Sequence, residues 1–479
     1  MTTASMASSQ ADPHSLLAHL RQVVGIPAED AASVTFEGVD PVFREPYPIG
    51  TVAAAAIAAT GQAASALWQL RTGRGQHVTV NVRAAAAAMR SSQYLRIEPR
   101  AGSVIVPPDQ GGSKARGFYQ TRDARWVYLH LGLPHHQTRI LSVLGAANTP
   151  ASVAKAVMKW SAADLEEQIY AAGACAGMVR TREEWAAHPH ARAVAEAPLI
   201  DIVKTGESAP QPLPPGNRPL AGIRVLDLTW VLAGPTGTRT LAEHGANVLR
   251  IGTDRLTQLS ELHMINTGFG KRSTVLNIHE PAGSKQLIQL VSGTDVFVQG
   301  YRGGSFAAHG YSAEALAQHR PGLIYVSMSA FGHLGPWRNR RGYDTLVSTV
   351  GGIAHENALA GVPRQLRSSP LDFLTGYLLA YGVMAALLRR AREGGSYHVR
   401  LSIARTNQWL LSLPRITADA AAKAAEDLSQ EEIAALSMTS ESPWGRLTHL
   451  APAVQLSETP ARWDRPSVPL AYHQPFWEE

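Results

Sequence analysis

Residues 223–252, "IRVLDLTWVLAGPTGTRTLAEHGANVLRIG", hold an apolar strand pattern, a Gly/Pro turn, a helical pattern and a second apolar strand pattern. This order predicts a βαβ unit. Further apolar stretches follow at 273–278, 295–301 and 323–332, with helical patterns at 280–291 and 312–320 between them. The alternation predicts an α/β fold with a doubly wound, parallel, Rossmann-like sheet that binds ligands at the carboxyl ends of its strands.

A stretch rich in Pro, Gly and Ser, "TGESAPQPLPPGNRPLAG" at 205–222, predicts a linker that divides the chain into two blocks. We place the first block at 1–204, the linker at 205–218 and the second block at 219–479. The first block holds an Ala-rich helix pattern, the strand "HVTVNV", a strand pair around "GFYQTRDARWVYLHL" and two further helical stretches. It is expected to include a smaller α+β domain.

The two blocks share one similar segment. Residues 58–80, "AATGQAASALWQLRTGRGQHVTV", align without gaps on residues 379–401, "LAYGVMAALLRRAREGGSYHVRL". The match favours a duplication over two unrelated helix–strand units of similar composition, although a repeat this short leaves both readings open. In the same alignment Thr51 of the first copy faces Asp372 of the second.

Composition narrows the class of protein. The chain has 479 residues, of which 45% are hydrophobic and 17% charged, as expected for a globular protein of two or more domains. Its formal charge of +6 comes from scattered Lys and Arg residues, which fits a small anionic ligand and does not require nucleic acid. The single cysteine, Cys175, rules out an intrachain disulfide and a cysteine-based metal cluster. With no secretory signal expected, and the uncharged stretch 51–68 expected to be a buried helix rather than a membrane span, we expect a cytoplasmic protein.

Several short motifs give little support for a cofactor or metal. Residues 234–240, "GPTGTRT", match neither the dinucleotide fingerprint nor the P-loop, so a nicotinamide or nucleoside triphosphate site is unsupported. The histidine pairs in "PHHQ" (134–137) and "HPHAR" (188–192) lack the spacing of metal ligands and are expected on surface loops. No GxSxG elbow is present, and Cys175 has no evident activating partner.

One carboxylate, Asp372, heads the long apolar helix pattern of residues 368–390. Pro370 and the serines before it suit a helix start, where the helix dipole favours an ionised carboxylate. Asp372 is therefore either a residue that stabilises the helix start or a nucleophile that attacks an activated acyl group to form a mixed anhydride. A thioester substrate with a phosphate-bearing handle would suit the second role. The phosphate groups of such a substrate would contact basic residues expected at strand and loop ends: Lys271, Arg272, Arg302 and Arg341.

Six stretches of the second block recur in one family in the same order and spacing. They are "RPLAGIRVLDLTWVLAGPTGTRTLAEHGANVLRI", "GKRSTVLNI", "DVFVQGYRGG", "GLIYVSMSAFGHLGPW", "RGYDTLV" and "PLDFLTGYLLAYGVMAALLRRAREGG". The chain thereby resembles the family III CoA-transferases (the CaiB/BaiF family), which include formyl-CoA, carnitine and benzylsuccinate CoA-transferases and α-methylacyl-CoA racemase. In the first block, "RTGRGQHVTV" and the run from "GFYQT" to "TREEW" resemble the later part of the same family. The chain is thus similar to a truncated family unit followed by the aspartate-bearing section of another, an unusual order of sections.

The resemblance implies a function and a set of site residues. Family members use no metal or redox cofactor, act on acyl-CoA and carboxylic acid substrates, and form interlocked homodimers. Asp372 stands at the position of the family's nucleophile. The family's CoA contacts fall on Leu232, Ala233, Leu276, Asn277, Ile278, His279, Gly300, Tyr301, Arg302, Arg341, Gly342, Tyr343 and Asp344. Gly111 and Gly112 are candidates for the glycine-rich loop that shields the intermediate in some relatives.

We therefore expect a CoA-transferase that works through an aspartyl anhydride and an aspartyl-CoA thioester. An acyl-CoA racemase has the same fold, but Tyr343 stands where racemases carry a histidine base, so transfer is favoured. A non-catalytic CoA-binding paralogue stays open, because one copy of the apparent duplication lacks the aspartate. A dinucleotide oxidoreductase is the alternative that the βαβ unit alone would allow.

Overall fold

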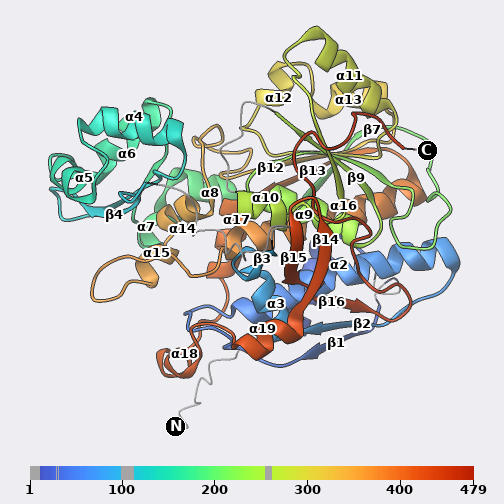
Figure 1. Cartoon of the computed structure of the whole chain (residues 1–479), viewed down its shortest axis with the longest axis horizontal. Coiled ribbons are helices and arrows are strands. Elements are labelled where there is room, and N and C mark those ends of the chain that lie inside the picture. Colours follow the sequence, from blue (N-terminus) through green and yellow to red (C-terminus); the bar gives the residue numbers. More distant parts are fainter. Residues whose placement is uncertain (1–10, 28–29, 31, 99–112, 254–260, 479) are drawn as a thin grey trace, which may run out of the picture.

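A seven-stranded sheet forms the centre of the computed structural model, which describes residues 11–27, 30, 32–98, 113–253 and 261–478 (Figure 1). Its strand order is β10-β9-β8-β11-β12-β13-β7. The strands are β7 (Asp201–Gly206), β8 (Arg224–Leu228), β9 (Asn247–Gly252), β10 (Lys271–Val275), β11 (Val296–Gln299), β12 (Ile324–Ser329) and β13 (Ser396–Ser402). All neighbours are parallel except β13 and β7. The predicted parallel α/β sheet is confirmed, with one antiparallel strand at its edge.

Helices cover both faces of this sheet, as the strand pattern requires. On β11, Val296 and Val298 join the core on one side and Phe297 joins the core on the other, because successive side chains of a strand point to opposite faces. One face packs against α9 (Ala233–Glu243) and α16 (Pro370–Glu393), and the other packs against α11 (Pro281–Ser292) and α13 (Ala313–His319). Further helices of the second block are α10 (Glu261–Asn266), α12 (Ser305–Ala308), α14 (Asp344–Val350), α15 (Ile353–Glu356) and α17 (Ile403–Leu411).

A small α+β module lies to one side of the sheet, drawn in teal in Figure 1. Its antiparallel strands β4 (Gly117–Gln120), β5 (Trp126–Leu129) and β6 (Ala176–Met178) share a separate core with three helices. These helices are α4 (Pro134–Leu144), α5 (Pro150–Val157) and α6 (Ala162–Ala171). The chain returns to the large sheet through α7 (Arg182–Ala187), α8 (Pro189–Glu196) and β7. This module corresponds to the smaller α+β domain expected in the first block.

The two blocks are interleaved. Strand β16 (Val454–Leu456) pairs with β2 (Val78–Asn81) beside β1 (Val34–Glu37), and β15 (Gly445–Leu450) pairs with β3 (Arg96–Glu98) beside β14 (Ser437–Ser442). The sequence boundary at residue 204 falls inside β7, because Gly206 still pairs with Ser396 of β13. The remaining elements are α1 (Pro13–Val24), α2 (Ile49–Thr72), α3 (Val82–Ala88), η2 (Ser91–Tyr94), α18 (Ala418–Lys423) and α19 (Gln430–Leu436).

The segments that look duplicated in sequence also match in three dimensions. Helices α2 and α16 are each 24 residues long, and each leads into a strand and a short helix. Strand β2 is parallel to β1 and antiparallel to β16, just as β13 is parallel to β12 and antiparallel to β7. A close contact between helix and following strand is also repeated, since a Cβ on Gly61 would meet Val78 at 2.7 Å and one on Gly382 would meet Val399 at 2.9 Å. This match supports the duplication.

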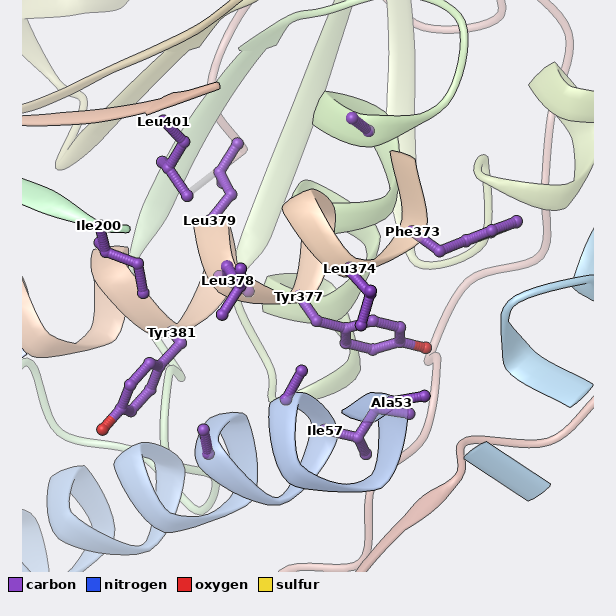
Figure 2. Close-up of a cluster of buried hydrophobic side chains, with 14 of the residues drawn as sticks. Ala53, Ile57, Ile200, Phe373, Leu374, Tyr377, Leu378, Leu379, Tyr381 and Leu401 are labelled. Carbon is purple, nitrogen blue, oxygen red and sulfur yellow. The ribbon is translucent and has the colours of Figure 1, made fainter. Parts of the chain in front are cut away.

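Helices α2 and α16 pack directly on each other in the core. Figure 2 shows Leu374, Tyr377 and Leu378 of α16 above Ala53 and Ile57 of α2. Both helices are long and apolar enough to cross a membrane by length and composition. Their apolar windows are fully buried inside the protein, and the core helices of globular proteins pass the same test.

Candidate active site

A cavity of about 350 Å³ opens at the carboxyl ends of β8, β11 and β12, beside the start of α16. This is the edge where ligands bind in doubly wound sheets. Asp372 lies in its wall, and the small module contributes Leu133 to His136 from the start of α4. The first block therefore takes part in the cavity, a point that the sequence left open.

The predicted site residues divide between two neighbouring cavities. The first cavity is lined by Leu232, Ala233, Gly300, Tyr301, Arg302, Arg341, Gly342, Tyr343 and Asp372. A second cavity of about 230 Å³ is lined by Leu276, Asn277, Ile278 and His279, near the ends of β9 and β10. Tyr301 and Ser305 belong to both linings. Asp344 lines neither cavity, and Gly111 and Gly112 lie outside the described residues.

The turn between β8 and α9 forms one wall of the first cavity and is held in an unusual conformation. Val231 has φ +68°, a region that β-branched residues rarely adopt. The buried carboxylate of Asp227 holds this turn in place. It accepts hydrogen bonds from the backbone N–H of Thr229 (3.0 Å) and from Thr238 Oγ1 (2.6 Å). Strain of this kind persists where the surrounding structure enforces it, commonly at functional sites.

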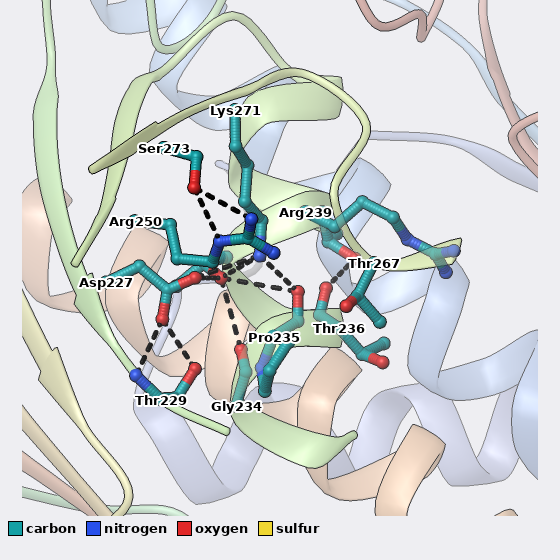
Figure 3. A network of polar contacts seen from close by, with 12 residues as sticks. Asp227, Thr229, Gly234, Pro235, Thr236, Arg239, Arg250, Thr267, Lys271 and Ser273 are labelled. Carbon is teal, nitrogen blue, oxygen red and sulfur yellow. Dashed lines mark hydrogen bonds and ion pairs between the residues drawn. The ribbon is translucent and has the colours of Figure 1, made fainter. Parts of the chain in front are cut away.

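Lys271 is buried and joins the same polar network as Asp227 (Figure 3). Its Nζ donates to Asp227 Oδ2 at 2.9 Å, and also to Thr238 Oγ1 and the Pro235 carbonyl. The prediction that Lys271 supplies a phosphate contact is wrong, because its ammonium is already paired in the core. Arg272 is also buried, and it pairs with Glu478 and donates to the Phe476 carbonyl at 2.6 Å.

Asp372 lies in the first turn of α16, as expected, but its surroundings oppose the ionised form that the helix start was expected to favour. Burial and the neighbouring Asp344 carboxylate raise the pKa of Asp372 well above its usual value. The backbone N–H of Asp372 donates to Asp344 Oδ2 at 3.0 Å, so Asp344 and not Asp372 caps this helix start. Among the described residues, none donates a hydrogen bond to the Asp372 side chain. The carboxyl group is therefore available to the cavity.

A third carboxylate, Glu45, reaches the same region from the first block. It accepts hydrogen bonds from the backbone N–H groups of Arg367 (2.9 Å) and Ser368 (3.3 Å), just before α16. Burial raises the pKa of Asp344 to about 7, and the charge of Glu45 adds to this rise. No local sequence signal marks Glu45, because its partners lie more than 300 residues further along the chain.

Two histidine rings of the small module pack against Tyr343, which lines the first cavity. The ring of Tyr343 stacks on His130 with centroids 4.4 Å apart, and burial raises the pKa of the Tyr343 phenol. Burial lowers the pKa of His130 to about 4 and of His136 to about 3, so both imidazoles are neutral at physiological pH. Cys175 Sγ lies 3.9 Å from His136 Nε2, yet burial raises its pKa to about 12 and keeps it a thiol.

The expectation that both histidine pairs lie on surface loops is wrong for one member of each pair, while His135 is exposed and His188 half-buried. His136 is buried beside Tyr343, and His190 is fully buried between the Phe331 carbonyl and the backbone N–H of Trp337. The polar residues beside these histidines in the sequence predict exposure. The burial arises from packing between distant parts of the chain, which the sequence does not show. Within the described ranges, no three His, Cys, Asp or Glu side chains are grouped as metal ligands would be.

Three arginines line the first cavity. Arg340 is committed elsewhere, because it forms an ion pair with Glu167 and stacks on Trp337 and Tyr170. Arg302 and Arg341 have no carboxylate partner in the part of the chain that the structure describes. The cavity therefore offers two cations without a carboxylate partner among the described residues, and the carboxyl group of Asp372.

Comparison with known proteins identifies the family. The sequence model of CoA-transferase family III matches residues 31–207 and 220–440, and the chain belongs to this family. The resemblance that predicted it is confirmed.

Individual relatives match over part of their length. The chain is 30% identical over 320 residues to an acyl-CoA transferase of Gibberella moniliformis, covering 61% of this chain and 56% of the relative. It is 31% identical to the acetyl-coenzyme A transferase nodX of Hypoxylon pulicicidum, covering 61% and 54%. It is 35% identical to a succinyl-CoA:glutarate CoA-transferase of Homo sapiens, covering 37% and 43%. The chain thus spans about half the length of the curated relatives it matches.

A crystal structure of a CAIB/BAIF family protein from Brucella suis is 27% identical, covering 41% of this chain and 56% of that one, with a TM-score of 0.39.

Proposed function

We propose that this protein is a CoA-transferase that moves CoA from an acyl-CoA donor to a carboxylic acid acceptor, with Asp372 as nucleophile. One observation carries the proposal. The buried carboxyl group of Asp372 lines a cavity at the carboxyl edge of the sheet, and no described residue donates a hydrogen bond to it. Membership of CoA-transferase family III supports it.

The proposed reaction consists of carbonyl substitutions that consume no water. An Asp372 oxygen attacks the thioester carbon, and CoA leaves as a thiolate, which gives a mixed anhydride. The thiolate attacks the aspartyl carbonyl and releases the donor acid as its carboxylate. The acceptor carboxylate then attacks the carbonyl carbon of the aspartyl-CoA thioester and expels CoA as a thiolate, which gives a second mixed anhydride. Finally, the CoA thiolate attacks the acceptor side of the new anhydride, so that the acceptor leaves as its CoA ester and the Asp372 carboxylate is restored.

The two cavities suit the two ends of an acyl-CoA. The second cavity, near the ends of β9 and β10, would hold the nucleotide end, because nucleotides bind at this edge of doubly wound sheets. The lining shared at Tyr301 and Ser305 would let the pantetheine arm pass to the first cavity. The thioester would then lie at Asp372, with the acyl group on the far side.

The small module would exclude water from the intermediates. Leu133 and Pro134 close the cavity with apolar surface, and the neutral His136 adds no charge there. An anhydride hydrolyses readily, so a dry wall protects it. We further propose a cytoplasmic homodimer that needs neither a metal nor a redox cofactor, which the family resemblance supports.

The test is mass spectrometry of the intact protein and its peptides after incubation with a panel of acyl-CoA esters, with Asp372→Asn as the matched control. We expect an acyl or CoA adduct on the Asp372 peptide of the wild type and none on the variant. CoA binding without any adduct, together with exchange of the substrate α-proton in deuterated solvent, would show a racemase instead. Binding with neither adduct nor exchange would show a non-catalytic paralogue.

A further inference from the structure

Trp230 lies across the boundary between the two cavities. It lines the first cavity, and its indole Nε1 donates a hydrogen bond at 3.1 Å to the hydroxyl of Tyr301, which lines both cavities. On the other side, Cη2 of the indole lies 3.7 Å from the position that a Cβ on Gly252 would take, and Gly252 lines the second cavity. The indole therefore reaches from the first cavity to the lining of the second.

The order of the strands places this indole where a ligand is expected. Trp230 follows β8, Gly252 ends β9 and Tyr301 follows β11. Strand β8 lies between β9 and β11, and the chain builds one side of the sheet through β9 and β10 and the other side through β11, β12 and β13. Doubly wound sheets bind their ligands at the point where the strand order reverses in this way. Trp230 lies at that point.

The hydroxyl of Tyr301 carries a proton that no described residue accepts. Burial raises the pKa of this phenol, so the proton is present at neutral pH. Its oxygen accepts from Trp230, and because an indole only donates, the hydroxyl proton must point to another acceptor. The ring is fixed by contact with Phe306 at a centroid distance of 4.7 Å, and the backbone N–H of Tyr301 donates to Gln299 Oε1 at 2.8 Å. The hydroxyl is therefore a donor in a fixed position.

The pantetheine arm of CoA, which links the nucleotide to the thioester, contains two amide groups. In the proposed function this arm passes Tyr301 and Ser305 on its way from the second cavity to the first. An amide carbonyl that leaves water needs a hydrogen-bond donor, because a buried acceptor without one costs free energy. The Tyr301 hydroxyl offers such a donor in the lining that the two cavities share.

We propose that Trp230 and Tyr301 form a subsite for the pantetheine arm, in which the Tyr301 hydroxyl donates to an amide carbonyl and Trp230 holds that hydroxyl in place. This inference rests on the proposed function. It adds Trp230, which is outside the predicted CoA contacts, and it gives the Tyr301 side chain a specific partner on the substrate. Trp230 acts through Tyr301 and is therefore a positioning residue.

The test measures binding by isothermal titration calorimetry with two probes, CoA and adenosine 3′-phosphate 5′-diphosphate, which is the nucleotide part of CoA without the arm. The proteins are the wild type, Tyr301→Phe, Trp230→Phe and the double variant. A neutral hydrogen bond predicts that Tyr301→Phe weakens CoA binding by roughly 3- to 10-fold. Trp230→Phe keeps an aromatic ring but loses the N–H, so it should weaken CoA binding by no more than Tyr301→Phe does.

The double variant and the nucleotide supply the controls. The double variant should bind CoA as Tyr301→Phe does, because Trp230 acts through the hydroxyl that is already lost. Every variant should bind the nucleotide as the wild type does, which also shows that the variants are folded.

The contrary results are distinct. Nucleotide binding that falls by the same factor as CoA binding would show that the pair contacts the nucleotide, which overturns the proposal, as does unchanged CoA binding in Tyr301→Phe. If the two losses multiply in the double variant, Trp230 contacts the arm independently of the hydroxyl, which overturns its positioning role. A wild type that does not bind CoA refutes the proposed function and this inference with it. The expected CoA results without any adduct on Asp372 would support the subsite and refute only the transfer reaction.

Discussion

Asp344→Asn should make the protein more stable at neutral pH and shift the pH dependence of its chemistry. Asp344 is buried, and its pKa is raised from an ordinary 3.8 to about 7 by burial, with the charge of Glu45 adding to the rise. An acid with a raised pKa keeps a proton in the folded state that the unfolded chain has already lost. The contribution of Asp344 to the free energy of unfolding therefore falls as the pH rises from about 4 to about 7, and it stays low at higher pH.

The magnitude follows from this shift. A rise from 3.8 to about 7 corresponds to a cost of about 4 kcal/mol above pH 7. Asparagine removes this cost but is a weaker acceptor for the backbone N–H groups of Leu371 and Asp372, a loss of about 1 kcal/mol for each bond. At pH 8 we therefore expect the free energy of unfolding of Asp344→Asn to exceed that of the wild type by about 2 kcal/mol. At pH 4 we expect little or no difference.

The functional consequence concerns Asp372. Removing the adjacent charge lowers the pKa of Asp372, so the acid limb of adduct formation should move to lower pH. The assays are denaturant unfolding at pH 4 and pH 8, and single-turnover adduct formation between pH 5 and pH 9. The matched control is Asp40→Asn, since Asp40 accepts the backbone N–H of Gly50 at 3.2 Å and that of Thr51 at the start of α2, with Thr51 in the place of Asp372. An unmoved acid limb in Asp344→Asn, or an equal shift in Asp40→Asn, would refute the reasoning.

Three further predictions concern stability. Gly382→Ala and Gly61→Ala should each cost about 1–3 kcal/mol in denaturant unfolding, because a Cβ at either position meets a neighbouring side chain at under 3 Å; a neutral result for both would contradict the repeated helix–strand contact. Lys271→Met should cost about 3–5 kcal/mol, because it leaves the Asp227 carboxylate buried without its cation, and adding Asp227→Asn should recover part of the loss in a double-mutant cycle. Val231→Gly should raise the thermal midpoint, because glycine adopts φ +68° without strain; a lower midpoint would show that the side chain contributes more than its strain costs.

The alternation of strands and helices could be predicted from the sequence because it depends on local patterns. In β8 to β12 each apolar run is bounded by turns or helical patterns, and the structure places the strands within a few residues of the expected ranges. The position of Asp372 also followed from a local signal, Pro370 at a helix start. Both are properties of short windows, which a single sequence shows directly.

The electrostatics of the site could not be predicted in the same way, because they depend on contacts between distant segments. Asp372 was expected to be ionised from its place in the first turn, but Asp344 caps that turn and Glu45 arrives from the other block. Lys271 and Arg302 look alike in sequence, yet one is buried against Asp227 and the other lines the cavity. Charge and burial at a site are tertiary properties, so one sequence leaves them open.

The duplication supports the proposed role of Asp372. In the first copy Asp40 caps α2 with Thr51 at the third position of the helix, so this helix start is satisfied without a second carboxylate. In the second copy Asp344 provides the same cap, and Asp372 adds a buried carboxyl group whose pKa both burial and Asp344 push upward. Asp372 is therefore neither needed for the cap nor favourable for stability. A residue that costs stability in one copy, is absent from the other and faces a cavity is best explained by chemistry, because strain of this kind is tolerated where function depends on it.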